Sequence, residues 1–202
     1  RHYAALTTLT PVLQNADGSV TPVPHSAVTT VEQVPGSTIT AQTIEGYTPT
    51  QSQITIPTPV PTSENFVNGK FIGTNINVIY TANEGNGTVV IATNQGSKTV
   101  TGIDGKTGQT VNIPTPSVDG YTPNRAMLTG VVNPDGSITV TTPKNPDKTD
   151  VTYTGNPTSA VVNFVDLDML DNNKQPTVVG QSQSIQGRVG DAVDLPITVP
   201  NS

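Results

Sequence analysis

The feature that most constrains this chain is an internal repeat. Gly120-Tyr121-Thr122-Pro123 repeats Gly46-Tyr47-Thr48-Pro49, and we call this four-residue motif the corner. A second landmark, Val78-Ile79-Tyr80-Thr81, returns as Val151-Thr152-Tyr153-Thr154. The two landmarks recur at spacings of about 74 and 73 residues, which amounts to a single period. Because unrelated landmarks seldom share a period, the sequence predicts an array of repeats rather than one large domain.

The period also predicts the boundaries of the repeats. We expect a first repeat over residues 1–84, whose N-terminal part is divergent, a second over residues 85–157 and an incomplete third over residues 158–202. Residues 187–196 of the third repeat match residues 105–114 of the second, and the sequence stops before another corner. A repeat of this size buries only about 60% of its unfolded surface, so a neighbouring repeat or a bound ion is expected to add stability. The third repeat is therefore partly open, completed by a neighbour or docked on the second.

Short alternating runs separated by turn residues indicate strands. In residues 75–80, Ile76 and Val78 alternate with asparagines, which is typical of a strand with one buried face. No window of a dozen residues carries the apolar stripe of an amphipathic helix, so any helix is short. The expected fold class is mostly β. Turns are expected where Asn, Asp and Gly tolerate a positive φ angle, at Asp17-Gly18, Asn68-Gly69, Asp104-Gly105 and Asn133-Pro134-Asp135-Gly136.

The charge pattern argues against nucleic acid as a partner. The formal net charge is −6, and the 9 lysines and arginines are scattered, whereas phosphate binding needs grouped basic side chains. The same scatter disfavours an anionic membrane surface, and no apolar run approaches the ~18 residues of a membrane span. The start at Arg1 carries no signal-peptide pattern, so we expect the chain to be a piece of a longer protein.

Cysteine is absent from the chain, which excludes disulfides, thiolate metal sites and a cysteine nucleophile together. A sequence that is rich in threonine, acidic, free of cysteine and repetitive is typical of an extracellular surface protein of a Gram-positive bacterium. The composition therefore favours an array on a cell surface.

Four segments can be read together as one composite repeat: Phe164-Val165-Asp166 with its Asn-rich turn, Gly187-x-x-Gly190-Asp191, the corner at Gly120, and Val151-x-Tyr153-Thr154. Together they resemble a known family. The resemblance is to the mucin-binding (MucBP, or MUB) repeats of cell-wall-anchored adhesins from lactic acid bacteria. It covers the second repeat and the third best. The second repeat departs at residues 89–92, which lack the aromatic residue and the aspartate of the opening, and the first departs over residues 3–31.

This resemblance implies a fold and a function. The implied fold is tandem β-grasp, ubiquitin-like modules strung head to tail in an elongated array. The implied function is non-catalytic adhesion to host mucus through mucin glycans, by a monomeric segment of an extracellular, cell-wall-anchored protein. Two alternatives stay open: a structural stalk, and binding of a host protein such as immunoglobulin through exposed strand edges. The sequence does not assign the ligand-binding residues, and the divergent residues 3–31 are the best candidate for a binding surface.

Tyrosine is the candidate sugar-binding aromatic residue, since the chain has no tryptophan. Tyr47 and Tyr121 stand at equivalent corners, and an aromatic residue that recurs once per repeat is more often a core anchor than a ligand contact. We therefore expect both side chains to be buried. Tyr80 and Tyr153 lie on alternating strands and are expected to be structural as well.

Asp166, Asp168 and Asp171 are the candidate metal ligands. Together with Asn172 and Asn173 they gather the oxygen ligands that calcium prefers. The spacing lacks the central glycine and the closing glutamate of an EF-hand. Because Asp and Asn also occupy turns on their own account, a solvated hairpin turn is the favoured interpretation and a weak calcium site is the alternative.

Catalytic chemistry has little support in the sequence. The histidines are His2 and His25, and His25 beside Ser26 makes no catalytic triad. Residues 102–108 are spaced by glycines, but they lie in a β-turn context without the helix that a phosphate-binding loop needs. We expect no catalytic residues, no cofactor and no enzyme activity.

Overall fold

The computed structural model describes residues 4–58, 66–162, 165–170, 172–174, 176–178 and 183–192. These residues form strands, turns and irregular segments, with no helix among them. The mostly β fold class is therefore confirmed. No helix long and apolar enough to cross a membrane occurs in this described part of the chain.

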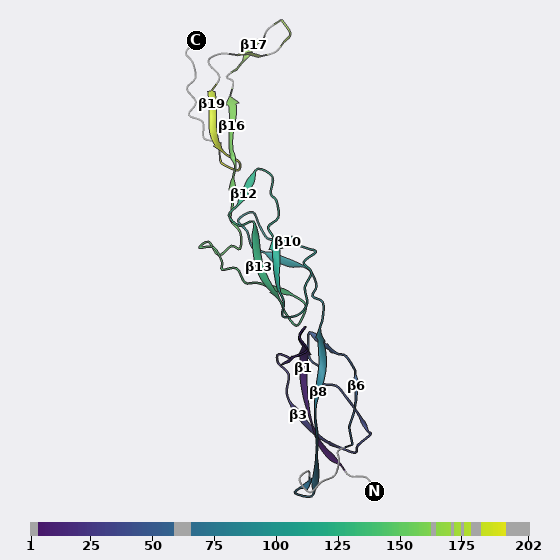
Figure 1. The fold of residues 1–202 in the computed structure, drawn as a ribbon. Coiled ribbons are helices and arrows are strands. Elements are labelled where there is room, and N and C mark those ends of the chain that lie inside the picture. The colour runs from purple at the N-terminus through teal and green to yellow at the C-terminus, as the bar shows by residue number, and fades with distance from the viewer. Residues whose placement is uncertain are drawn as a thin grey trace. The chain divides into compact units, whose positions relative to one another are not determined.

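Strands β1 to β8 come from the first repeat and are separated by turns, of which the sequence predicts those at Gly18 and Gly69 (Figure 1). Gly18, Gly36 and Gly69 have positive φ angles at these turns, as expected for the residue type that adopts this conformation at no steric cost. The strand bounds are β1 Ala5–Gln14, β2 Val20–Pro22, β3 Thr29–Gln33, β4 Thr38–Thr40, β5 Tyr47–Pro49, β6 Gln53–Thr55, β7 Phe66–Val67 and β8 Lys70–Ala82.

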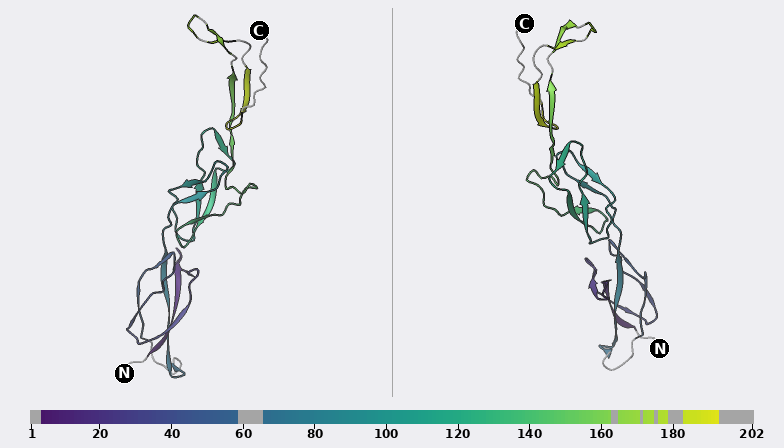
Figure 2. Two further views of the ribbon diagram at one scale, coloured as in Figure 1. Left: turned by 180° about the vertical axis from the view of Figure 1, so that it is seen from behind. Right: turned by 45° about the horizontal axis from the view of Figure 1, so that its top comes forward.

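The centre of this region is a parallel pair of strands. β1 pairs with β8 from Ala5↔Phe71 to Leu13↔Tyr80, and the two strands lie side by side in Figures 1 and 2. β2 and β3 are antiparallel to β1, while β5 and β7 are antiparallel to β8. The sheet order is β2-β1-β8-β5. The first and last long strands of the first repeat thus form the middle of one mixed sheet.

The core of this sheet forms because apolar side chains alternate along β8. Val78 and Tyr80 are buried while Asn75 and Asn77 are exposed, which confirms the predicted strand with one buried face. Complete burial of an aliphatic side chain contributes about 1.5–3 kcal/mol, so the cluster formed on this face is the main support of the sheet. The cluster also includes Leu9, Val23, Ala41, Ile44, Tyr47 and Ile54.

Strands β9 to β19 form smaller sheets, with the orders β10-β9, β11-β13-β14, β12-β15, β16-β19 and β17-β18. In the third repeat β16 is antiparallel to β19, from Pro157↔Arg188 to Val162↔Gln183. The bounds are β9 Val89–Ile91, β10 Lys98–Val100, β11 Thr110–Pro114, β12 Tyr121–Pro123, β13 Met127–Val132, β14 Ile138–Val140, β15 Tyr153–Gly155, β16 Pro157–Val162, β17 Val165–Leu170, β18 Pro176–Val178 and β19 Gln183–Arg188.

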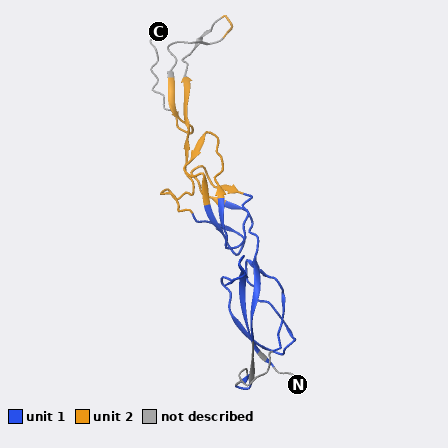
Figure 3. Cartoon of the chain, in the orientation of Figure 1, with its two compact units in different colours: residues 1–89, 101–112, 129–141 blue, residues 90–100, 113–128, 142–202 orange. Residues whose placement is uncertain are grey.

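The chain divides into two compact units, coloured separately in Figure 3. Unit 1 holds the first repeat with part of the second, and unit 2 holds the rest of the second repeat with the third. The repeat boundaries stay a prediction of the sequence period. Unit 1 consists of Arg1–Val89, Thr101–Asn112 and Thr129–Thr141, and unit 2 consists of Val90–Val100, Ile113–Leu128 and Thr142–Ser202.

One predicted turn is wrong. Asp104-Gly105 lies in an irregular segment, and the chain turns instead at Thr107-Gly108, where Gly108 has a φ angle of 86°. Glycine is required at position 105 for close packing and not for a turn, because a Cβ atom there would lie 2.5 Å from Val111 Cγ1. The sequence does not separate the two roles, since both require glycine.

Candidate functional site

The corner is built twice with the same strand pairing. In the first repeat β5 is antiparallel to β8, with Pro49 opposite Tyr80. In the second repeat β12 is antiparallel to β15, with Pro123 opposite Tyr153. The two sequence landmarks of each repeat are therefore neighbouring strands, paired in the same register.

A hydrogen bond from a tyrosine to a backbone carbonyl also recurs. Tyr80 Oη donates to Gln42 O at 2.6 Å, and Tyr153 Oη donates to Pro116 O at 2.6 Å. Tyr80 is 1% exposed and Tyr153 is 3% exposed, and burial raises the pKa of both phenols. Each tyrosine fastens the segment before a corner to the last strand of its repeat, which confirms the expected structural role.

The corner tyrosines differ in burial. Tyr47 is 7% exposed and belongs to the core cluster, which confirms the expected anchor. Tyr121 is only partly buried, so the expectation of a buried side chain is wrong for the second repeat. The Tyr121 phenol lies against Gly190, whose missing side chain leaves room for the oxygen. This packing favours a structural role over a sugar-stacking role for both rings.

The corner of the first repeat meets a turn of the second repeat. Asn83, which follows β8, donates its N–H to Gly46 O at 2.8 Å, and its carbonyl accepts the Thr107 N–H at 2.9 Å. The Asn83 Oδ1 atom accepts the Thr48 hydroxyl at 2.6 Å. Gly46 is required here, because its φ angle is 84° and a Cβ atom would lie 2.9 Å from Thr107 Cγ2. We call these contacts, all within unit 1, the first junction.

A second junction repeats these contacts within unit 2. Asn156 donates its N–H to Gly120 O at 2.7 Å, and its carbonyl accepts the Val189 N–H at 3.0 Å. The Asn156 Oδ1 atom accepts the Thr122 hydroxyl at 2.5 Å. A Cβ atom on Gly120 would lie 3.0 Å from Val189 Cγ1. The same surfaces of consecutive repeats therefore meet in the same way at both junctions.

At each junction the corner of one repeat contacts a turn of the next repeat that is centred on a glycine. We call this turn the glycine turn, and it consists of residues 106–109 in the second repeat and 188–191 in the third. Gly108 and Gly190 both have a φ angle of 86°. In each turn the first residue donates its N–H to the side chain of the fourth at 2.8 Å, Lys106 to Gln109 Oε1 and Arg188 to Asp191 Oδ2. The sequence match between the second and third repeats thus falls on a junction surface.

A five-residue turn of pattern Asn-x-Asp-x-Ser/Thr occurs at residues 15–19, 133–137 and 145–149. In each turn the aspartate accepts the hydroxyl and the N–H of the Ser or Thr two residues later. These hydrogen bonds, chiefly those from the hydroxyl, hold the pKa of each carboxyl below its usual range. The sequence predicted the first two turns and did not predict the third. The aspartates are Asp17, Asp135 and Asp147.

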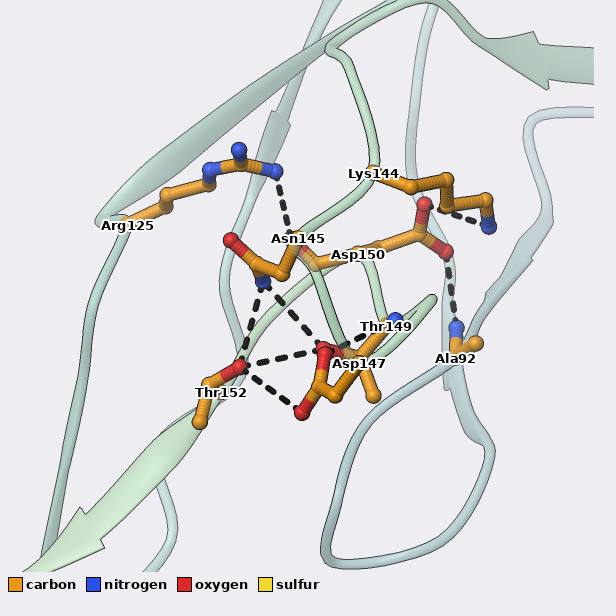
Figure 4. A network of polar contacts seen from close by, with 8 residues as sticks. All are labelled: Ala92, Arg125, Lys144, Asn145, Asp147, Thr149, Asp150 and Thr152. Carbon is orange, nitrogen blue, oxygen red and sulfur yellow. Dashed lines mark hydrogen bonds and ion pairs between the residues drawn. The ribbon is translucent and has the colours of Figure 1, made fainter.

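A buried carboxylate lies beside the third of these turns (Figure 4). Asp150 is 2% exposed, its Oδ2 accepts the Ala92 N–H at 2.8 Å, and Lys144 Nζ lies 2.7 Å from its Oδ1. Arg125 Nη1 donates to Asp150 O at 3.0 Å. The hydrogen bond to Ala92 and the ion pair with Lys144 fasten residues 144–150 to Ala92. The network also includes Asn145, Asp147, Thr149 and Thr152.

The calcium candidates fall partly outside the described residues. Asp171 lies outside them, and Asp166 and Asp168 are placed by their backbone alone, in strand β17. The expected turn is present at residues 172–174, where Lys174 has a φ angle of 60°. Within the described ranges, no group of three or more His, Cys, Asp or Glu side chains is arranged to hold a metal ion. The calcium site stays a prediction.

His25 and Ser26 lie in a turn. Ser26 Oγ donates to Val23 O at 2.6 Å, and the Ser26 N–H donates to the same carbonyl at 3.2 Å. His25 is exposed and has a φ angle of 61°, in the left-handed region. The hydroxyl of Ser26 is therefore directed at a backbone carbonyl. His2 lies outside the described residues.

Sequence reasoning missed the junction asparagines and the buried aspartate. Asn83 and Asn156 both stand three residues after the tyrosine of the second landmark, so the period itself is a signal that could have found them. Asp150 carries no such signal, because its counterpart one period earlier is Asn77, an exposed residue. Its role depends on Ala92, which is remote in the sequence.

The chain was compared with protein-family models, with curated proteins and with solved structures, and none of them matches. The argument for a function therefore depends on the repeats and their contacts.

Proposed function

We propose that this chain is a non-catalytic repeat segment of a bacterial surface adhesin, and that it binds host mucin glycans through several weak contacts. The observation that carries the proposal is the recurrence of the corner, the asparagine and the glycine turn in one geometry at both junctions. A chain that makes the same contacts at successive repeat boundaries is organised for serial display rather than around one deep site. The resemblance to mucin-binding repeats of cell-wall-anchored adhesins provides the ligand and the extracellular location.

The fold proposed for each repeat is a β-grasp, with the repeats strung in tandem. Support comes from the first repeat, where β1 and β8 are parallel neighbours in the middle of a mixed sheet of order β2-β1-β8-β5. Ubiquitin-like sheets have this central parallel pair. Residues 34–46, which lie between β3 and β5, contain β4 and turns instead of a helix. The proposed module is therefore a form of the β-grasp without a helix in this segment.

The described surface suits shallow polar contact with sugars. Three of its hollows have volumes of about 210, 170 and 280 Å³, below the ~300–1,000 Å³ of pockets that enclose small molecules. The hollow beside β8 is lined in part by Thr50, Gln51 and Asn77, all exposed. Hydroxyl and amide groups both donate and accept hydrogen bonds, as sugar hydroxyls do, so neutral side chains of this kind fit a glycan better than a charged ligand.

Binding is expected to be weak for one chain and much tighter for linked chains, because tethered modules raise the effective concentration without any new contact. Surface plasmon resonance on immobilised mucin would compare the chain with a tandem duplicate of itself. Deglycosylated mucin is the matched control surface. We expect the duplicate to bind mucin on the order of 10²-fold more tightly than the single chain, and neither form to bind the control surface.

Other outcomes point to other functions. Equal affinities of the chain and its duplicate would contradict multivalent binding. If neither form binds mucin, the chain is better described as a structural stalk, which the junction contacts also favour because they hold consecutive repeats in register. Binding that survives deglycosylation would indicate a protein ligand, such as immunoglobulin at an exposed strand edge.

A further inference from the structure

The first repeat contains its own copy of the glycine turn, over residues 34–37. Gly36 has a φ angle of 86° and donates its N–H to Ile56 O at 2.8 Å. At the same place in the second repeat, Gly108 has a φ angle of 86° and donates its N–H to Val132 O at 2.8 Å. In both repeats a second hydrogen bond runs in the opposite direction. The N–H of Ile56 donates to Ser37 O, and the N–H of Val132 donates to Gln109 O. The element that receives a corner in the later repeats is thus present in the first.

The three glycine turns differ at the residue before the glycine. This residue is Thr107 in the second repeat and Val189 in the third, and in both cases its N–H donates to the carbonyl of a junction asparagine. In the first repeat it is Pro35, which has no N–H. The first glycine turn therefore lacks the backbone donor that both junctions use.

Proline leaves the shape of the turn intact. Pro35 stands directly before a glycine of positive φ, which is the arrangement of a type II turn, where proline is favoured at this position. The bond across the turn is also kept, since the Ser37 N–H donates to Val34 O at 3.1 Å as the Gln109 N–H donates to Lys106 O at 2.9 Å. Proline at this place thus removes the donor without removing the turn.

The surface around this first glycine turn is open in the described structure. Val34 is 41% exposed, and no described atom lies within 4 Å of a Cβ atom placed on Gly36. At Gly108 a Cβ atom would lie 3.7 Å from Tyr47 Oη, and at Gly190 it would meet the Tyr121 phenol. The first turn is therefore the uncovered copy of a surface that is covered in both later repeats.

We propose that the residue before the turn glycine decides whether a repeat can receive the corner of a preceding repeat, and that Pro35 closes the first repeat to such a partner. A docked corner would place an asparagine carbonyl against the proline ring. That carbonyl would lose its hydrogen bonds to water and gain no partner, which makes docking unfavourable. The rule concerns how repeats associate, and it stands whether or not the chain binds mucin.

The test introduces a proline before the turn glycine at each of the two junctions of the full chain. Thr107→Pro and Val189→Pro each remove one junction donor while keeping a residue that the glycine turn accepts. Thr107→Ala is the matched control, because it keeps the N–H and removes the β-branched side chain. In NMR spectra, cross-relaxation between the Tyr47 ring and Gly108 reports on the first junction, and that between the Tyr121 ring and Gly190 reports on the second.

We expect Thr107→Pro to lose the first contact and keep the second, and Val189→Pro to do the reverse. Thr107→Ala should keep both contacts. The proposal is overturned if either proline variant keeps the contact at its own junction, or if Thr107→Ala loses the first contact. Loss of both contacts in one proline variant also overturns it, because the substitution would then unfold the chain instead of releasing one junction.

Discussion

Residues with a left-handed backbone lie at the turns of this chain, and most of the described residues with this conformation are glycines. The fourth position of the Asn-x-Asp-x-Ser/Thr turn has a φ angle of 85° at Gly18 and 87° at Gly136. In the third copy of the turn the same position is Lys148, with a φ angle of 66°. A side chain in this region costs about 1–2 kcal/mol. Lys148 is exposed, so its side chain gains no burial in return.

Lys148→Gly is therefore expected to raise the free energy of unfolding by about 0.5–1 kcal/mol. The relief of the left-handed conformation exceeds the extra entropy that glycine loses on folding, about 0.5–1 kcal/mol. Chemical denaturation measures the change. Gly18→Ala is the control, since nothing lies within 4 Å of a Cβ atom there, and it should lower the free energy of unfolding by about 1 kcal/mol through conformation alone. A Lys148→Gly variant less stable than the wild type would refute the argument.

Among the elements, a pair of strands and one tyrosine hydroxyl make up the constant part of each repeat. β5 with β8 and β12 with β15 share one register. The hydroxyls of Tyr80 and Tyr153 reach the carbonyls of Gln42 and Pro116 across equivalent segments. The first strand of each repeat is less constant, since β1 has 10 residues and β9 has 3. The repeats thus agree where they meet their successors and differ in the length of their first strands.

Tyr80→Phe and Tyr153→Phe should each lower the free energy of unfolding by about 1–2 kcal/mol, because each removes a hydrogen bond and leaves a carbonyl without its partner. We expect equal effects, since the two bonds have the same length and the two rings are similarly buried. Urea denaturation monitored by tyrosine fluorescence would measure both. Tyr121→Phe is the control, because its hydroxyl donates to no described residue, and it should change little. A silent substitution at Tyr80 or at Tyr153 would show that the two strands are not equivalent.

For the chain as a whole, the contacts between repeats are an important source of order. Each repeat is too small to bury a large core, and the junctions add hydrogen bonds between consecutive repeats at Asn83 and Asn156. Stability is therefore expected to depend on neighbouring repeats, as in other repeat proteins. The remaining candidate for added stability is a bound ion at the acidic turn of the third repeat.

Calcium is expected to leave the melting temperature of the chain unchanged. A calcium ion needs 6–8 oxygen ligands, and the side chains of Asp166, Asp168 and Asp171 can supply only a few of them. A bound ion would add about 2.7 kcal/mol at a hundredfold excess over its Kd. Melting curves with calcium and with a chelator, for the wild type and for Asp168→Ala, make the comparison. A melting temperature that calcium raises in the wild type but not in Asp168→Ala would establish the site.

Local patterns in the sequence were sufficient to determine the period, the mostly β class and most of the turns. Alternation along residues 75–80 predicts the buried face of β8, because side chains two apart in a strand point the same way. Turn residues such as Asp17-Gly18 identify positions of positive φ, because the preference belongs to the residue type itself. Tyr80 and Tyr153 could be recognised as structural for a similar reason, since an aromatic residue that recurs with the period usually anchors each repeat.

Only the tertiary structure decided which polar groups meet. Asn83 and Thr107 look like ordinary residues of a β-rich sequence, and their roles arise because the chain path brings the carbonyl of one within 2.9 Å of the N–H of the other. Asp150 acquires its role in the same way, because the chain path brings the Ala92 N–H to its carboxylate. Tyr121 is less buried than Tyr47 although their motifs are identical, because burial depends on the segments that cover a ring and not on the ring's own sequence. Hydrogen-bond partners and burial are properties of residues far apart in the chain, and a local pattern carries no record of them.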